Sequence, residues 1–216
     1  MIMASKNTEL LPAGESGFRT ASNILRAGGL VAFPTETLYG LGADARNDAA
    51  VRKVFAAKAR PSEKALIVLV RDFSEAARYG DLNDRARRLA EVFWPGALTL
   101  IVNRRDASGL SAEINPGGAT IALRVPGSDI ALSLLRAFAG PLTAPSANPS
   151  GVTPPTTAEQ VMRGLGGAID AVLDGGPCPG NESTIVDVSE NEPRLLREGA
   201  ISRDEIAQTL NPVHLR

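Results

Sequence analysis

The chain has 216 residues, of which 44% are hydrophobic and 22% are charged, as is usual for a folded globular protein with one large domain. Its formal net charge of −1 argues against a general nucleic-acid-binding surface, because such a surface needs an excess of Lys and Arg. No apolar run approaches the roughly 20 residues that span a bilayer, and the N-terminus has no signal-peptide core. We therefore expect a cytoplasmic protein that does not bind a membrane.

Hydrophobic periodicity in the first half of the chain predicts helices that alternate with strands. A helix over 16–27 stops at Gly28 and Gly29, and a strand over 30–33 ends at Pro34. Asp48 is a good N-cap for the next helix, which we expect to end near Ala59. The elements after it are a strand over 65–70, helices over 73–79 and 84–93, and a strand over 97–102.

The second half of the chain also contains strands that follow one another directly. Its predicted elements are a strand over 120–125, a helix over 128–138, an extended segment over 141–145, a helix over 157–164, strands over 171–174, 183–188 and 194–198, and a helix over 203–210. This order predicts an α/β fold of the α+β type, in which helices cover a mixed sheet. We assign a flexible N-terminus to 1–15, one domain to 16–206 and a tail to 207–216.

The sequence offers little cysteine or histidine chemistry. Cys178 is the single cysteine, which excludes an internal disulfide, and no Cys/His spacing is typical of a zinc site. We interpret Cys178, in the loop GGPCPG, as a passive thiol. The single histidine, His214, lies near the C-terminus, where chains often fray. Histidine acid–base catalysis and a Ser/His triad are therefore disfavoured.

Lys58 interrupts the apolar stripe of the helix that begins near Asp48. Val51, Val54 and Phe55 form the stripe, and Lys58 occupies its next position. Its ammonium could reach a cleft while its stem covers apolar neighbours, or it could simply favour the helix C-terminus. The pattern does not decide between these interpretations. Arg60 follows at the helix end, and Lys64 is typical of a solvated turn.

Arg124 occupies an unusual position in the strand over 120–125. Period-2 alternation places it on the same face as Thr120 and Ala122. A sheet covered on both faces normally has an apolar residue there, because an unpaired buried charge is very costly. Arg124 therefore has a buried partner or lines a cavity. Ser183, in the strand over 183–188, also breaks the apolar pattern, although Ser is common enough in strands to need no functional explanation.

Two loops carry hydroxyl and amide groups suited to an anion. PTETLYGLG (34–42), if extended, places Thr35, Thr37 and Tyr39 on one side. PSANPSG (145–151) allows close backbone approach to an anion. A plain strand exit explains the first loop equally well, and an Asx-type turn explains the second. The Gly-rich phosphate motifs GxxxxGK[ST] and GxGxxG do not occur, so any nucleotide is held by dispersed cations and hydroxyls.

Several ordered motifs resemble those of one family. PTETLYGLG, KAR, WPGALTLIV, TIALRVP, SAN, ESTIVDV and LLREGAIS together resemble the YrdC-like family of threonylcarbamoyl-AMP synthases over roughly 16–206. The resemblance implies a mixed, strongly twisted sheet with a concave, positively charged cleft. It also implies synthesis of threonylcarbamoyl-AMP and pyrophosphate from L-threonine, bicarbonate and ATP with Mg2+, and transfer of the threonylcarbamoyl group to tRNA by a partner complex.

The resemblance also implies roles for individual residues. The catalytic KxR and SxN elements fall on four positions, Lys58, Arg60, Ser146 and Asn148. The residues facing ATP would be Arg60, Lys64, Thr120, Ser146 and Arg197. The residues facing threonine would be Thr37, Arg124 and Ser183. We expect Mg2+ to be carried by the nucleotide phosphates rather than by a protein ligand, although Glu36 and Asp187 lie near the loops.

Two features depart from the longer members of the family. Those members often have Asn and His where this chain has Lys64 and Leu69, so the threonine pocket at Leu69 is expected to differ. They also carry a second domain after the LRxG segment, whereas this chain continues for about 17 residues beyond Gly199. Two alternative functions remain: an RNA-binding module without turnover, and a paralogue that adenylates a different carbamate. The 4% aromatic content disfavours base stacking in the first of these.

Overall fold

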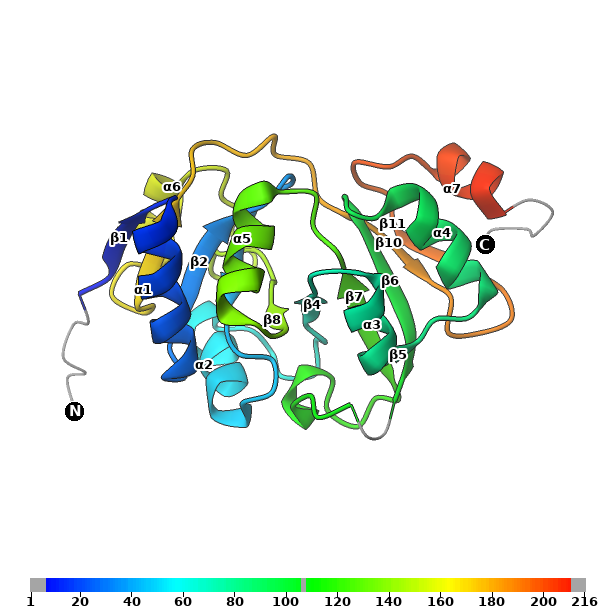
Figure 1. Ribbon diagram of the computed structural model, residues 1–216, viewed down its shortest axis with the longest axis horizontal. Coiled ribbons are helices and arrows are strands. Elements are labelled where there is room, and N and C mark those ends of the chain that lie inside the picture. The colour runs from blue at the N-terminus through cyan, green and yellow to red at the C-terminus, as the bar shows by residue number, and fades with distance from the viewer. Residues whose placement is uncertain (1–6, 106–107, 211–216) are drawn as a thin grey trace.

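Two mixed β-sheets lie next to each other and are covered by helices (Figure 1). The computed structural model describes residues 7–105 and 108–210. The first sheet has the strand order β1-β9-β2-β3, with β1 at Glu9–Pro12, β2 at Val31–Pro34, β3 at Tyr39–Gly42 and β9 at Ala171–Asp174. Strands β1, β9 and β2 are parallel, and β3 pairs antiparallel with β2.

The second sheet is larger and runs in the order β11-β10-β6-β7-β4-β8, with β5 paired to β6. Its strands are β4 (Ile67–Leu69), β5 (Gly80–Asp81), β6 (Leu98–Arg104), β7 (Thr120–Arg124), β8 (Leu142–Thr143), β10 (Thr184–Asp187) and β11 (Arg194–Arg197). The pairs β10/β6 and β4/β7 are parallel, and the other pairs are antiparallel. Isolated bridges from Gly40 to Ser146 and from Asp44 to Leu142 join the two sheets.

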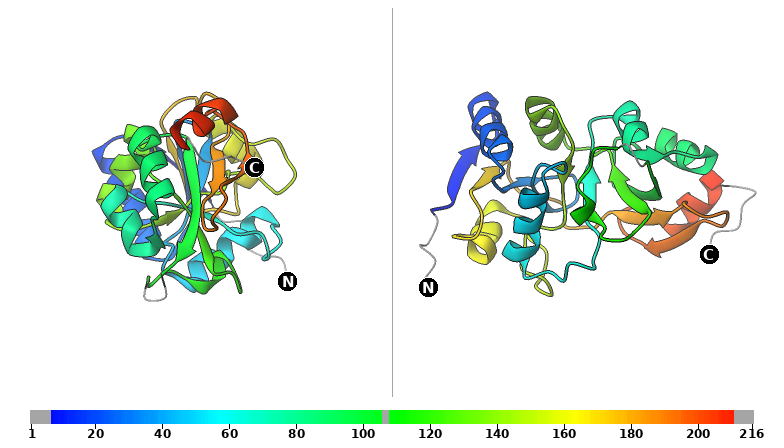
Figure 2. Two further views of the ribbon diagram at one scale, coloured as in Figure 1. Left: turned by 90° about the vertical axis from the view of Figure 1, so that its right-hand side faces the viewer. Right: turned by 90° about the horizontal axis from the view of Figure 1, so that it is seen from below.

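Helices cover the two sheets unequally. They are α1 (Glu15–Arg26), α2 (Asp48–Lys58), α3 (Phe73–Tyr79), α4 (Asp84–Phe93), α5 (Asp129–Phe138), α6 (Ala158–Leu165) and α7 (Arg203–Leu210), with a 3-10 turn, η1, at Ala112–Ile114. Helices α1, α5, α3 and α4 lie along one side of both sheets, whereas α2 and α6 lie on the other side, beside the first sheet (Figure 2). The second sheet is therefore more open on the side that faces α2.

Side-chain caps fix where several helices begin. The Asn47 side chain accepts a hydrogen bond from Ala50 N at 3.1 Å and caps α2, so the N-cap is Asn47 rather than Asp48. Asp48 becomes the first helical residue, where its negative charge favours the helix N-terminus. Ala59, with a φ of 47°, ends α2 in the left-handed conformation and turns the chain toward Arg60.

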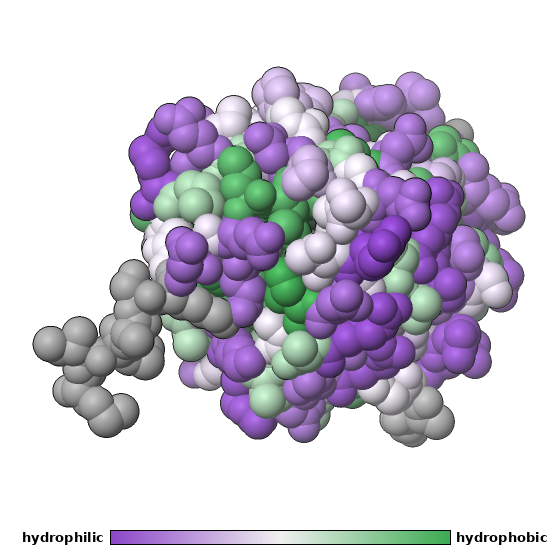
Figure 3. Space-filling model, turned by 60° about the vertical axis from the view of Figure 1, so that its left-hand side comes forward, coloured by the Kyte–Doolittle hydropathy of each residue, from purple (hydrophilic) through white to green (hydrophobic). Residues whose placement is uncertain are grey.

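The apolar core runs through both sheets. Phe33 and Leu41 in the first sheet and Leu100 and Leu123 in the second are fully buried. Hydrophilic side chains cover most of the face shown in Figure 3, with only a narrow apolar band across it. No helix within the described residues is long and apolar enough to cross a membrane.

The structure corrects three sequence-based predictions about the fold. The predicted α/β fold with a mixed, helix-covered sheet is confirmed, but its strands are divided between two sheets. Residues 9–12, which we expected to be flexible, form β1 against β9, and the second half of PTETLYGLG forms strand β3. Only residues 35–38 of that motif make a turn, so its hydroxyls do not alternate along a strand. His214 and the tail beyond residue 210 lie outside the described residues.

The glycines in β3 obscured that strand because glycine is uncommon in strand interiors. Here they permit close packing. A Cβ on Gly42 would lie 2.8 Å from Phe33 Cε1, and a Cβ on Gly40 would lie 3.3 Å from Ala144 Cβ. The first glycine makes room for a core ring, and the second lets β3 approach the segment that carries Ser146.

Thr184→Val is expected to destabilise the second sheet. The buried Thr184 hydroxyl donates to Ile201 O at 2.6 Å and accepts from Gly199 N and Ile201 N, each at 3.0 Å. Valine has nearly the same shape but leaves these backbone groups without their partner. We expect urea denaturation to show a loss of about 2–4 kcal/mol in the free energy of unfolding. Thr209→Val, which removes a hydrogen bond to Glu205 O, is the control, and an equally small loss for both variants would contradict the prediction.

Candidate active site

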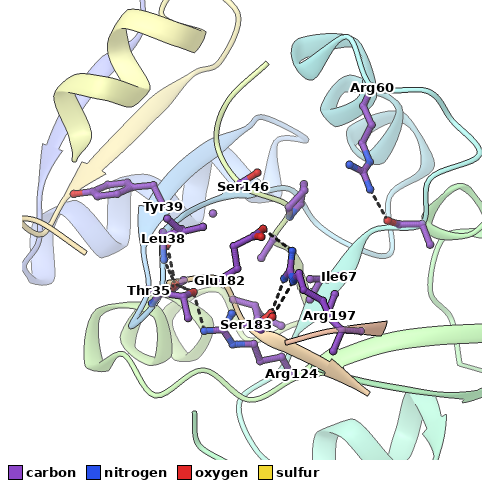
Figure 4. A pocket seen from close by; sticks show the side chains of 17 residues that line it. Thr35, Leu38, Tyr39, Arg60, Ile67, Arg124, Ser146, Glu182, Ser183 and Arg197 are labelled. Atoms are coloured by element: carbon purple, nitrogen blue, oxygen red, sulfur yellow. Dashed lines mark hydrogen bonds and ion pairs between the residues drawn. The ribbon is translucent and has the colours of Figure 1, made fainter. Parts of the chain in front are cut away.

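A cleft of about 250 Å³ lies where the two sheets meet. Its walls come from the turn between β2 and β3, the end of β7, the segments beside β8 and β10, and β11, and Arg60 enters from the end of α2 (Figure 4). Among the described residues, its charged lining consists of three arginines and one glutamate, Arg60, Arg124, Arg197 and Glu182. The lining therefore has an excess of positive charge although the chain as a whole is slightly acidic.

Arg124 lies at the base of the cleft and is 5% exposed. Its Nε donates to Gly96 O at 3.1 Å, and its Nη2 donates to Glu36 Oε1 at 2.6 Å and to Thr37 Oγ1 at 3.0 Å. The sequence left two interpretations open, a buried partner or a cavity, and both are correct. These bonds hold the guanidinium plane and leave Nη1 without a protein partner among the described residues. The site thus has a fixed, buried cation with donors available for an anion.

Hydroxyl groups of the β2–β3 turn lie beside Arg124. Thr35 Oγ1 is 2.8 Å from Thr37 Oγ1 and donates to Leu38 O at 2.7 Å. It also accepts from Leu38 N at 3.2 Å, so the turn is held by its own side chain. The turn places Thr37 against Arg124, and both residues line the cleft (Figure 4).

Arg197 and Ser183 line the cleft beside Arg124 (Figure 4). Arg197 donates from Nε to Ser183 O at 2.9 Å and from Nη2 to Ser183 Oγ at 3.0 Å. Its Nη1 pairs with Glu182 Oε1 at 2.5 Å. The pKa of Arg197 is lowered, chiefly by burial; Glu182 raises it, and the like charge of Arg124 lowers it further. Two arginines therefore share this region, which favours a ligand that carries negative charge.

Arg60 and Ser146 line the other side of the cleft. The Arg60 side chain donates to Lys64 O at 3.2 Å and to Ala65 O at 2.9 Å, and burial lowers its pKa. Ser146 lies in the loop after β8 and bridges to Gly40 of β3. In Figure 4 these two residues lie across the cleft from Arg124. The polar side chains of the cleft therefore form two groups, one around Arg60 and Ser146 and one around Arg124.

Lys58 lies behind the Ser146 loop rather than in the cleft. Its side chain is 2% exposed, and its ammonium donates to Ser146 O and, at 2.6 Å, to Asn148 O. It is absent from the described residues that line the cleft. The stripe left open whether the ammonium reaches a cleft or favours the helix C-terminus; in the structure it faces inward and binds the carbonyls of the Ser146 loop. Burial lowers the pKa of Lys58 to about 8, with a smaller contribution from the like charge of Arg60.

Three further residues predicted for the site do not line the cleft. Lys64 is exposed in the turn after Arg60. Thr120 begins β7, about 13 Å along the strand from Arg124, and its hydroxyl lies 3.4 Å from Asn115 Nδ2. Asn148 is 7% exposed, and its Nδ2 donates to Pro149 O at 3.0 Å and to Val152 O at 2.5 Å. Asn148 thus stabilises its own loop.

Other cleft residues were missed in the sequence. Glu36 does not itself line the cleft and was considered only as a metal neighbour, yet it is the partly buried ionic partner of Arg124, which does line it. Glu182, the ion-pair partner of Arg197, is the first residue of the ESTIVDV motif. Its place in that motif was the one feature of the sequence that could have identified it as a site residue. Apolar contacts from Leu38, Ile67 and Ile185 complete the lining, and Leu69, expected to shape the pocket, also lines it.

Cys178 behaves as a passive thiol in this geometry. It is buried, and burial raises the pKa of its thiol. The backbone of Thr35 lowers that pKa by a smaller amount. A buried thiol with a raised pKa is a poor nucleophile, which agrees with the interpretation of its loop.

Sequence comparisons connect this cleft with known proteins. The family model Sua5_yciO_yrdC, described as "Telomere recombination", matches residues 23–199. The chain is 42% identical over 210 residues to a threonylcarbamoyl-AMP synthase of Bacillus subtilis, a match that covers 96% of this chain and 60% of the relative. It is 36% identical over 157 residues to a threonylcarbamoyl-AMP synthase of Cellvibrio japonicus, a match that covers 72% of this chain and 82% of the relative.

A structural comparison gives the same result. The crystal structure of Pyrococcus abyssi Sua5 complexed with L-threonine superposes with a TM-score of 0.92 and 37% sequence identity. The superposition covers 97% of this chain and 63% of that one. The chain thus spans about 60% of the length of the Bacillus relative and of this structural neighbour.

Proposed function

We propose that this chain, which belongs to the Sua5–YciO–YrdC family, synthesises threonylcarbamoyl-AMP from L-threonine, bicarbonate and ATP and releases pyrophosphate. The observation that carries the proposal is the convergence of three arginines, from the segment just after α2, from β7 and from β11, on one hydroxyl-lined cleft. One arginine can bind a carboxylate while the others face a polyphosphate. The names of the relatives and the threonine complex of the P. abyssi protein support this assignment.

The threonine side of the cleft is proposed to be formed by Arg124, Thr37 and Ser183. Arg124 offers Nη1 to the carboxylate, since its other donors already contact Gly96, Glu36 and Thr37. Hydroxyls on both sides of the guanidinium provide further hydrogen bonds. A planar guanidinium fixed in this way orients the amino acid as well as neutralising its charge.

The nucleotide side is proposed to be formed by Arg60, Ser146 and Arg197. The threonine amine attacks CO2 and loses a proton, or attacks bicarbonate with loss of water, to form a carbamate. A carbamate oxygen then attacks the α-phosphorus of ATP, and the bond to the β-phosphate oxygen breaks with loss of pyrophosphate. Two anions must approach each other in this step, so positioning and charge neutralisation supply most of the catalysis.

Mg2+ is proposed to enter on the phosphates of ATP. The described residues hold no group of three or more His, Cys, Asp or Glu side chains that could bind a metal ion. Glu182 lines the cleft and is a carboxylate that fits a cation brought in by the nucleotide. The ion supplies neutralisation of phosphate charge. The threonylcarbamoyl-AMP product is proposed to serve tRNA modification in the cytoplasm, through a partner complex.

Threonine-dependent release of pyrophosphate tests the proposal. The protein is incubated with ATP, Mg2+ and bicarbonate, with and without L-threonine. We expect release only when threonine and bicarbonate are both present, with threonylcarbamoyl-AMP detected by mass spectrometry. Release that is indifferent to threonine would reject the proposal. Release supported only by a different amine would instead favour a paralogue, and salt-sensitive tRNA binding without turnover would favour an RNA-binding module.

A further inference from the structure

The Lys58 ammonium binds the backbone of the loop that carries Ser146. It donates to the carbonyls of Ser146 and Asn148, and the Lys58 carbonyl accepts from Ser150 N at 2.8 Å. Three hydrogen bonds therefore join the last residue of α2 to this loop. Arg60 lies two residues beyond Lys58. Lys58 therefore connects Arg60 with the loop that carries Ser146, and both of these residues are proposed for the nucleotide side of the cleft.

Strand β3 holds the other side of the loop. Ala147 N donates to Tyr39 O at 2.8 Å, and Leu41 N donates to Pro145 O at 2.8 Å. The loop is thus held between β3 and Lys58, with Ser146 turned toward the cleft. If the Lys58 contacts were lost, only the β3 side of the loop would remain held.

A buried ammonium is an unfavourable group at a position of the apolar stripe. Apolar residues occupy the earlier stripe positions of α2, Val51, Val54 and Phe55, and a charged group buried among them costs free energy unless it is hydrogen-bonded. Charge-assisted hydrogen bonds to two loop carbonyls offset that cost, and these carbonyls lie outside any helix or regular strand ladder. The charge is therefore explained by the loop and not by the core.

We propose that Lys58 is a positioning residue that fixes Ser146 and Arg60 relative to each other, acting through the loop backbone rather than by touching the nucleotide. The kinetic part of this inference rests on the proposed function. The conformational part does not, because the order of the loop can be measured without any substrate.

Hydrogen exchange of the ligand-free protein tests the conformational part. In Lys58→Met we expect the amides of Asn148 and Ser150, on the Lys58 side of the loop, to exchange at least about 10-fold faster, while Ala147, bonded to β3, and the β7 amides keep their protection. Lys53→Met is the matched control, since Lys53 also lies on α2 and donates to a carbonyl, Gly28 O, at 2.6 Å. It should leave the loop unchanged. Unchanged loop exchange in Lys58→Met would overturn the proposal, whatever the activity.

A double-mutant cycle with Ser146→Ala tests the kinetic part. If Lys58 acts through the loop, Lys58→Met should raise the ATP KM about 10-fold or more in the wild-type background and less than about 3-fold in the Ser146→Ala background. The threonine KM should change little in both. Equal losses in the two backgrounds would mean that Lys58 contacts the nucleotide independently, and would overturn the proposal.

Lys58→Arg separates position from charge and retains a cation if the methionine variant fails to fold. The guanidinium is larger than the ammonium and Lys58 is only 2% exposed, so we expect the loop to be displaced, with faster exchange at Asn148 and an increase in ATP KM despite the retained charge. A phosphate-binding cation would tolerate this change. Normal exchange together with normal kinetics in Lys58→Arg would therefore contradict the positioning role.

Discussion

Arg124→Lys is expected to raise the threonine KM on the order of 30-fold while leaving the ATP KM within about 3-fold of its wild-type value. The guanidinium contacts Gly96 O, Glu36 and Thr37 from Nε and Nη2 and retains Nη1 for a ligand. A lysine ammonium concentrates its donors at one point and does not reach all of these groups at once. Steady-state pyrophosphate release, with each substrate varied in turn, measures both constants.

The control for this experiment is Arg52→Lys. Arg52 lies on α2 and forms a surface ion pair with Glu113 at 2.8 Å, where a lysine can replace it at little cost. We expect its kinetics to match those of the wild-type protein. If Arg124→Lys raised the KM values for threonine and ATP equally, the assignment of Arg124 to the threonine carboxylate would be refuted.

Arg60→Met is expected to lower kcat by about 100- to 1,000-fold, the usual effect of removing one preorganised charged donor from a transition state. Arg60 lines the part of the cleft that we propose holds the nucleotide, and its guanidinium donates to two backbone carbonyls, those of Lys64 and Ala65. Methionine keeps much of the apolar stem and loses the charge. Single-turnover pyrophosphate release at saturating substrates measures the effect on the chemical step.

Threonine binding provides the internal control for Arg60→Met. Calorimetric titration with threonine alone should give the wild-type affinity, because Arg124, Thr37 and Ser183 are untouched. Arg52→Met, which removes an exposed arginine from α2, the helix that ends just before Arg60, should keep normal turnover. Loss of threonine affinity with an unchanged kcat would contradict the assignment of Arg60 to ATP.

Local sequence patterns predicted which side chains face inward. The alternation in β7 identified Arg124 as a charge that needs a partner or a cavity, and the stripe of α2 placed Lys58 on the apolar face without deciding where its ammonium lies; both residues are buried. Neither pattern predicts which groups contact the charged end of the side chain. Arg124 meets an ion-pair partner at the edge of a cleft, whereas Lys58 meets loop carbonyls 88 and 90 residues away in the chain. That difference depends on tertiary contacts.

The division into two sheets was not predictable from periodicity. The pattern of β9 and of β10 is that of a buried strand in each case, yet the first pairs with β1 and β2 and the second with β6 and β11. Alternation determines which side chains of a strand face the core, but it does not determine which strand pairs with it. β1 has only 4 residues, of which Leu11 is buried, so it carried too weak a pattern to identify.

The position of the cleft between the two sheets has a mechanical consequence. Thr37 belongs to the turn of the first sheet, whereas Arg124 ends β7 and Ser183 directly precedes β10 in the second. Isolated bridges such as Gly40–Ser146 connect the two sheets. An amino acid held by all three side chains would cross-link the sheets. Its binding energy would then oppose any displacement of one sheet relative to the other.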